Sequence, residues 1–348
     1  MNFNTILQGD ALEQLQTLPD NCIDCCVTSP PYYGLRDYGI AGQIGLEERP
    51  EEYIDKLVSI FRELKRVLKP TGTFWLNVGD SYAGGQGRWG GGVSNITTKQ
   101  SSNNGSLSQI PSTHKWEHET IKSKDLIGIP WMLAFALRSD GWYLRQDIVW
   151  AKTNAMPESV TDRCTKSHEY IFLLTKEPHY YFDHEAIQEP CVRDTGNADI
   201  KFGGNKYRYG KRGDEKVSHI YSGRTYHPKH KNLQYDGQTP NTMHKRRAEG
   251  LPDIEYTVRN KRDVWSLPVA QYKGAHFATF PEKLVAPCIL AGCPVGGVVL
   301  DPFFGSGTVG KVAIQLNRQY LGVELNEKYI KLAQERLGDI QLTLEGLI

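Results

Sequence analysis

The sequence lacks the features that mark membrane, secreted and disulfide-rich proteins. It has no uninterrupted apolar run of about 18 residues, and the nearest candidate, 284–300, is broken by prolines and glycines. Its first residues show no basic start followed by an apolar core, so no secretory signal is expected. Seven cysteines in 348 residues form no regular disulfide framework. We therefore expect a globular protein of the reducing cytoplasm.

A zinc site is poorly supported by the cysteine spacing. Cys22, Cys25 and Cys26 contain a C-x-x-C pattern, but zinc needs a second ligand pair, and Cys288 with Cys293 has the wrong spacing. We expect these cysteines to be small apolar strand residues and predict no metal.

Net charge is also nearly absent, at +1, but the charges are unevenly distributed. Residues 193–262 hold 16 Lys and Arg against 8 Asp and Glu, a net charge of +8. Tyrosines are interleaved with these basic residues: Tyr207, Tyr221, Tyr226, Tyr235 and Tyr256. This mixture suits phosphate contacts and base stacking, so we predict a recognition segment at 185–262. A solvated basic surface is the alternative.

Outside this segment the apolar pattern predicts alternating strands and helices. A strand is expected to end near Gly9-Asp10, and further strands are expected at 23–28, 73–78, 142–150, 169–175, 298–301 and 320–325. Helices are expected after Asp10 and at 51–69, 129–139, 282–291, 308–316 and 326–337. The order predicts an α/β fold with a largely parallel sheet. Residues 83–111 are rich in Gly, Ser, Asn and Gln and are expected to be a mobile loop, either a lid or a passive insertion.

One conspicuous motif is Thr28-Ser29-Pro30-Pro31-Tyr32-Tyr33-Gly34, which follows the apolar run 23–27. Its prolines fix the backbone and remove two N–H donors, which we expect to leave carbonyls free to accept hydrogen bonds. With the Ser29 hydroxyl and the Tyr32 ring, such a turn can hold a flat group that bears an amine. A simple strand-ending turn is the alternative.

A second motif, VVLDPFFGSGTVG at 298–310, reads as strand, tight turn and helix, and Glu324 ends the next strand. Such glycines let a ligand approach a helix N-terminus, and the later acid can bind ribose hydroxyls, so an adenosine cofactor is expected. NAD is the rival. Only about 40 residues follow Gly305, so the rest of the sheet must come from the N-terminal half, in a permuted order. Both motifs would then face one crevice.

Together, Ser29-Pro30-Pro31-Tyr32 and Phe303-Phe304-Gly305-Ser306-Gly307 resemble the (S/N/D)-P-P-Y and F-x-G-x-G motifs of β-class S-adenosylmethionine-dependent DNA amino-methyltransferases. The segment 276–284 is also similar to that family. The resemblance implies a Rossmann-like methyltransferase sheet with permuted motif order and an inserted basic target-recognition segment. It divides the chain into a catalytic half at 1–184 with a mobile loop at about 83–115, the recognition segment at 185–262, and a cofactor-binding half at 263–348.

The resemblance also implies the site residues. The expected catalytic residues are Ser29, Pro30, Pro31 and Tyr32. The expected S-adenosylmethionine-binding residues are Asp10, Thr279, Lys283, Asp301, Phe303, Gly305, Ser306, Gly307, Thr308 and Glu324. Turn capping by Asp10 and helix capping by Thr279 are the alternatives. Further candidates, either as target contacts or as structural residues, are Asp80, Trp150, Lys152, Asn154, Asp162, Arg163, His168 and Glu169.

The implied reaction is methylation of an exocyclic amine on a base flipped out of DNA. Ser29 Oγ and the Pro30 carbonyl would accept hydrogen bonds from the amine, and Tyr32 would stack on the base, without a covalent intermediate. Ser29 favours N4 of cytosine in this family, and N6 of adenine is the alternative. C5 methylation needs a Cys nucleophile, and the Pro-Cys pair at Cys191 lies in the recognition segment.

The expected partners are DNA and, as an open question, a cognate restriction endonuclease, with the protein a monomer or a homodimer. Three more distant alternatives are a nicotinamide oxidoreductase, a DNA-binding regulator with a degenerate catalytic fold, and a protein or RNA methyltransferase.

Overall fold

The computed structural model describes residues 2–35, 37–83, 118–190, 258–269 and 281–345. The chain forms two units, one of residues 1–188 with 260–348, the other of residues 189–259. Most of the predicted loop at 83–115, most of the recognition segment at 185–262 with its five tyrosines and Cys191, and Thr279 lie outside the described residues. No helix among the described residues is long and apolar enough to cross a membrane.

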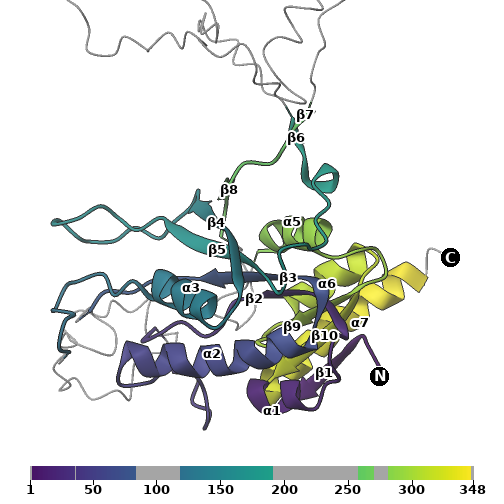
Figure 1. Cartoon of the computed structure of the whole chain (residues 1–348), viewed down its shortest axis with the longest axis horizontal. Coiled ribbons are helices and arrows are strands. Elements are labelled where there is room, and N and C mark those ends of the chain that lie inside the picture. The colour runs from purple at the N-terminus through teal and green to yellow at the C-terminus, as the bar shows by residue number, and fades with distance from the viewer. Residues whose placement is uncertain (1, 36, 84–117, 191–257, 270–280, 346–348) are drawn as a thin grey trace, which may run out of the picture. The chain divides into compact units, whose positions relative to one another are not determined.

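The first unit alternates strands and helices along the chain (Figure 1). Its strands are β1 (Thr5–Gln8), β2 (Ile23–Thr28), β3 (Leu68–Val78), β4 (Tyr143–Lys152), β5 (His168–Thr175), β8 (Val264–Leu267), β9 (Val298–Asp301) and β10 (Gln319–Glu324). Its helices are α1 (Ala11–Gln16), α2 (Pro50–Val67), α3 (Ile129–Ser139), α5 (Glu282–Gly292), α6 (Thr308–Gln315) and α7 (Glu327–Glu345), with a 3-10 turn at Glu185–Ile187.

The eight strands form one sheet in the order β1-β10-β9-β2-β3-β5-β4-β8. All neighbouring pairs are parallel except those of β5, which runs against both β3 and β4. The sheet is therefore mixed but largely parallel, as expected, with β5 as its one antiparallel strand. The connection from β4 to β5, residues 153–167, contains no crossover helix, so the chain turns back and β5 pairs antiparallel with β4. The strand β2, near the start of the chain, lies beside β9, near its end.

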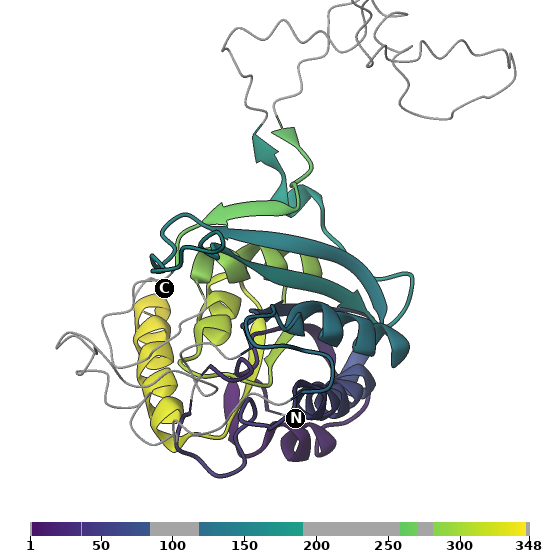
Figure 2. The same cartoon turned by 90° about the vertical axis from the view of Figure 1, so that its left-hand side faces the viewer.

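Helices cover both faces of the sheet, and the strand residues alternate between two apolar cores (Figure 2). Cys26, Phe74 and Leu76 pack on the side of α1, α2 and α3. Cys25 and Trp75 pack on the side of α5, α6 and α7. This two-sided burial explains why the central strands read as continuous apolar runs, and it confirms the expected apolar role of Cys25 and Cys26.

Most predicted elements are confirmed, with shifted ends. Helix α2 begins at Pro50 and ends at Val67 instead of continuing to Lys69, because Leu68 already pairs with Ile23 in the sheet. The predicted stop at 69–72 is an irregularity inside β3, which starts at Leu68. Strand β8 was not predicted, and α7 continues past the expected end at 337. Asn326 caps α7 as expected, since its Oδ1 accepts a hydrogen bond from Lys328 N at 2.9 Å.

In the second unit, the described residues form the strands β6 (Glu189–Pro190) and β7 (Val258–Arg259), which pair antiparallel. Arg259 Nε also lies 2.8 Å from Glu189 Oε1. The residues that flank the segment 191–257 therefore lie side by side.

Candidate active site

The two sequence motifs line one cavity of about 480 Å³ in the first unit. Its walls come from the ends of β2, β9 and β10, from the segment that follows the Pro-Pro turn, and from β4 and β5. Parallel strands that end together create such a crevice at the edge of a sheet. Most of the predicted site residues line it: Asp10, Ser29, Pro31, Tyr32, Asp301, Phe303, Gly305, Ser306, Thr308 and Glu324.

The turn that bears Ser29 is held from both sides. Before it, Thr28 Oγ1 donates to Asp301 Oδ1 at 2.6 Å, which ties the end of β2 to the end of β9. After it, the Tyr53 hydroxyl of α2 donates to the Pro31 carbonyl at 2.9 Å. The expectation of free carbonyls is therefore wrong for Pro31. Among the described residues, none donates a hydrogen bond to the Pro30 carbonyl.

Tyr32 is anchored by its hydroxyl rather than left to move. The hydroxyl donates to Glu169 Oε2 at 2.7 Å, and Asn77 Oδ1 lies 3.1 Å away. Ser29 Oγ donates to the same hydroxyl oxygen at 3.3 Å. Burial, followed by the charge of Glu169, raises the pKa of Tyr32 well above its usual value. The phenol therefore remains protonated and keeps its hydrogen bond at neutral pH.

The glycine turn is organised around Glu324. Gly305 N donates to Glu324 Oε2 at 2.7 Å, and Asn326 N donates to Glu324 Oε1 at 2.7 Å. Burial raises the pKa of this carboxyl, while its backbone hydrogen bonds lower it. The turn uses left-handed backbone at Gly305, with φ of 50°. An acidic oxygen pair and a close backbone thus face the cavity together, which suits the two hydroxyls of a ribose.

A second buried acid, Asp301, lies at the end of β9. Burial raises its pKa to about 7, and hydrogen bonds from the Thr28 hydroxyl and from Phe303 N partly oppose that rise. Asp301 therefore titrates near neutral pH, unlike an exposed aspartate.

Four predicted residues lie elsewhere or serve another role. Gly307 begins α6 at φ 78°, where a Cβ would lie 3.1 Å from that of Ala333, so its smallness serves helix packing. Lys283 is exposed and Pro30 is buried, and neither lines the cavity. Asp10 accepts hydrogen bonds from Leu12 N and Glu13 N and thereby caps α1, as its alternative role predicts, although it also lines the cavity.

Sequence reasoning missed Asn77 and left Glu169 undecided. Both line the cavity and contact Tyr32, and Lys152 pairs with Glu169 there. Their signal in the sequence is weak, because a polar residue at the end of an apolar strand has many uses. Asp80, by contrast, accepts from Gly128 N and thereby supports the start of α3.

The other candidate target contacts divide between the cavity rim and structural contacts. Trp150 donates from Nε1 to Leu267 O at 2.9 Å, and Asn154 Oδ1 accepts from Val269 N at 2.6 Å. The carboxylate of Asp162 pairs with Lys124 at 2.8 Å. The remaining contacts are Arg163 with Glu158 and the ring of His168 against that of Tyr170.

The strand order is combined here with a Ser-Pro-Pro-Tyr turn that faces a glycine turn and an acid. This combination is typical of DNA amino-methyltransferases. A family model described as DNA methylase matches residues 23–335, and the chain belongs to this N6/N4 DNA methylase family. It is 43% identical to the type II methyltransferase M.SmaI of Serratia marcescens, over 95% of this chain and 90% of that protein.

Two solved structures share the fold. The Thermus thermophilus protein TTHA0409, complexed with S-adenosyl-L-methionine, matches with a TM-score of 0.51 and 22% identity over 96% of this chain and 94% of that one. The cytosine-N4-specific PvuII DNA methyltransferase matches with a TM-score of 0.52 and 17% identity over 98% of this chain and 92% of that one. The family assignment removes the oxidoreductase alternative.

Proposed function

We propose that this DNA methylase transfers a methyl group from S-adenosyl-L-methionine to the exocyclic N4 of a cytosine flipped out of the duplex. One observation carries the proposal: Ser29 and Tyr32 line the same cavity as Gly305 and Glu324. The catalytic turn and the expected cofactor turn thus face one space, although they are far apart in the sequence.

The residues of the cavity fit the cofactor. Glu324 would hold the ribose hydroxyls, and Asp301, Ser306 and Thr308 would line the methionine part. The bound cofactor supplies an activated methyl group as the electrophile. Access to the glycine turn requires a backbone without a side chain, and Gly305 provides it.

The residues of the turn would prepare the amine. A base amine is a poor nucleophile because its lone pair is delocalised into the ring. Hydrogen bonds from its N–H groups to Ser29 Oγ and the Pro30 carbonyl would favour a tetrahedral nitrogen with an available lone pair. Two observations support these roles: no donor among the described residues bonds to the Pro30 carbonyl, and Thr28 is fixed to Asp301. Catalysis would rest on positioning and electrostatics.

Cytosine is favoured over adenine by Ser29 at the first motif position, and the fold match to a cytosine-N4-specific enzyme supports it. Adenine N6 presents the same amine geometry and is the second candidate. The test is incubation of the purified protein with labelled S-adenosyl-L-methionine and DNA of varied sequence, followed by mass spectrometry of the nucleosides. N4-methylcytosine is expected. N6-methyladenine would establish the alternative, and absence of label from every DNA would overturn the proposal.

The order of the motifs fits the permuted β arrangement, with the catalytic half at 1–184 and the cofactor-binding half at 263–348. We place target recognition in the basic segment at 185–262 and a mobile loop at about 83–115. Similarity to type II methyltransferases supports a cytoplasmic modification enzyme that acts beside a cognate restriction endonuclease. Light scattering would decide between a monomer and a homodimer.

A further inference from the structure

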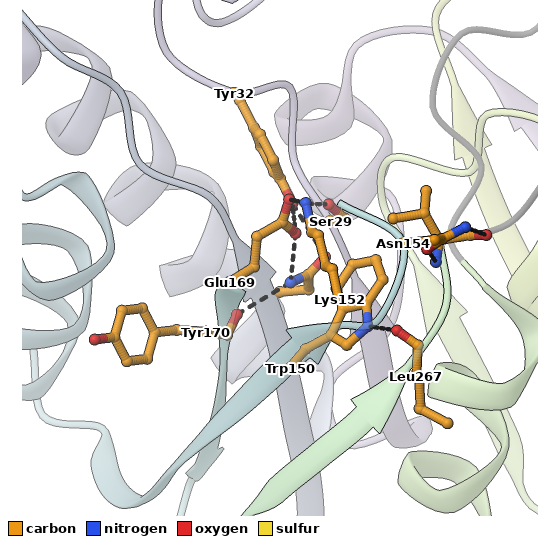
Figure 3. Close-up of polar contacts among 10 residues, drawn as sticks. Ser29, Tyr32, Trp150, Lys152, Asn154, Glu169, Tyr170 and Leu267 are labelled. Atoms are coloured by element: carbon orange, nitrogen blue, oxygen red, sulfur yellow. Dashed lines mark hydrogen bonds and ion pairs between the residues drawn. The ribbon is translucent and has the colours of Figure 1, made fainter. Parts of the chain in front are cut away.

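Glu169 lies at the centre of a polar cluster beside the catalytic turn (Figure 3). Its Oε2 accepts hydrogen bonds from the Tyr32 hydroxyl at 2.7 Å and from Asn77 Nδ2 at 3.2 Å. Its Oε1 pairs with Lys152 Nζ. Asn77 also donates to the Tyr170 carbonyl at 3.1 Å, so the amide group is fixed in turn. Glu169 is therefore the one residue of the cluster that contacts each of the other three side chains.

The cluster is built on the sheet rather than on loops. Asn77 comes from β3, Lys152 from β4 and Glu169 from β5. Asn77 pairs with Ile171 across β3 and β5, and Glu169 is two residues from Ile171, so both point to the same face. Sites on strands hold their side chains more precisely than sites on loops.

The ion pair is largely removed from solvent. The side chains of Lys152 and Glu169 are 21% and 12% exposed. Lys152 Nζ also lies 5.0 Å from the centre of the Trp150 ring, which is fixed by its bond to Leu267. A buried carboxylate needs such compensation, and loss of one partner leaves the other charge unpaired. Lys152 thus holds the Glu169 carboxylate beside the Tyr32 hydroxyl.

The Tyr32 ring is confined along its edge as well as at its hydroxyl. A Cβ built on Gly79, just after β3, would lie 2.6 Å from Tyr32 Cε2. The absence of that atom lets the ring pack against the backbone. A ring fixed at both places has little freedom to rotate before a base arrives.

We propose that Glu169, held by Lys152, is a positioning residue that acts through the Tyr32 hydroxyl and fixes the ring for stacking on the flipped base. This assignment rests on the proposed methyl transfer. Fold stabilisation alone would account for the Lys152–Glu169 ion pair. Our assignment gives this pair a role in turnover as well. A preorganised ring avoids an ordering cost when the base enters the cavity.

The test is a double-mutant cycle on methyl transfer with Glu169→Ala, Tyr32→Phe and the double variant. Glu169→Ala is expected to lower kcat by about tenfold to a hundredfold, while S-adenosyl-L-methionine binding in calorimetry stays within about twofold of wild type. In the Tyr32→Phe background, Glu169→Ala is expected to cost little more, because the hydroxyl through which it acts is gone. Glu169→Gln keeps an acceptor of the same size and is expected to retain more activity than Glu169→Ala.

Glu158→Ala is the matched control, because Glu158 pairs with Arg163 at 2.6 Å and does not line the cavity. It is expected to leave kcat unchanged. Thermal unfolding of every variant separates loss of fold from loss of positioning, and Glu169→Gln serves if Glu169→Ala does not fold. Wild-type turnover by Glu169→Ala, or losses that multiply in the double variant, would overturn the assignment. A wild-type enzyme without methyl transfer would instead refute the proposed function.

Discussion

At the scale of single residues, Ser29 is the group on which the proposed chemistry depends most. Its hydroxyl lies at the cavity and donates only a long hydrogen bond, of 3.3 Å, to Tyr32. The Ser29 hydroxyl donates in that bond, so its oxygen keeps lone pairs that can accept a hydrogen bond from an incoming amine. The residue is therefore free to act on a substrate, whereas the neighbouring Thr28 is committed to Asp301.

Ser29→Ala is expected to lower kcat about 100-fold, because one of the two acceptors for the amine disappears. Binding of S-adenosyl-L-methionine should not change, since Ser29 contacts no group of the glycine turn. Single-turnover methylation and calorimetry measure the two effects. Ser59→Ala on α2, whose hydroxyl bonds only to the Asp55 carbonyl, is the control. If Ser29→Ala weakened cofactor binding by as much as it lowered kcat, Ser29 would belong to the cofactor-binding part of the site instead.

Asp301 makes stability depend on pH. Its pKa is raised to about 7 in the folded protein, above its unfolded value, so the fold binds a proton that the unfolded chain releases. Its contribution is complete below the unfolded pKa and is lost as pH rises through the folded value. Between about pH 4 and 7, the wild type should therefore lose about 1.4 kcal/mol per pH unit relative to Asp301→Asn. Urea unfolding of both proteins without cofactor measures the difference, and parallel curves would contradict it.

The same scale shows what sequence reasoning can reach. Ser29, Tyr32, Gly305 and Glu324 were predicted because each lies in a motif whose residues are close in the chain. Glu169 was left undecided, because its contact with Tyr32 spans 137 residues and depends on the reversed direction of β5. Register between distant strands cannot be read from local spacing.

At the scale of elements, Gly79, which follows the end of β3, packs against the Tyr32 ring at the cavity. Gly79→Ala is expected to push the Tyr32 ring from its place, because the new methyl group would meet it at 2.6 Å. We expect a loss of kcat of about tenfold or more, with cofactor binding retained.

Gly338→Ala is the matched control for this substitution. A Cβ there meets nothing within 4 Å, and Gly338 lies inside helix α7. Alanine should stabilise the helix by up to about 1 kcal/mol and leave turnover unchanged. Methylation rates and thermal unfolding measure both variants. Unchanged turnover in Gly79→Ala would show that the ring need not be fixed.

Long elements with a clear apolar period were predictable, as was the short buried strand β9, whereas the short strand β8 was not. The stripe on α2 identified the helix, yet its last turn was misplaced because pairing of Leu68 with Ile23 competes with helix continuation. Strand β8 has only four residues, and only Trp265 among them is buried. Such a strand forms because it pairs with the edge strand β4. It therefore depends on a tertiary contact rather than on a local sequence pattern.

At the scale of the whole molecule, the strands β6 and β7 place the residues that flank 191–257 side by side. This basic segment can therefore be exchanged without stretching the chain on either side. Replacement by a short Gly-Ser linker should leave the first unit folded and able to bind S-adenosyl-L-methionine, because the described residues of that unit form two apolar cores of their own.

Site-specific methylation of DNA by the shortened protein is expected to fall below detection, and DNA binding should lose much of its salt dependence. Filter binding at several salt concentrations and methylation assays measure the two effects. Retained sequence specificity would place recognition elsewhere in the chain. As a control, the same linker inserted at Gly296, an exposed turn residue with open space around it, should leave specificity intact.

The pairing of β2 with β9 also affects how the protein is made. The hydrogen bond from Thr28 to Asp301 spans 273 residues, which a ribosome adds over tens of seconds at about 5–20 residues per second. Throughout that time β2 has an open, apolar edge, and such edges invite aggregation. The nascent chain therefore carries an unpaired β2 edge until β9 is made. The glycine turn that we propose to bind the methyl donor follows β9, so the proposed active site is completed only late in synthesis.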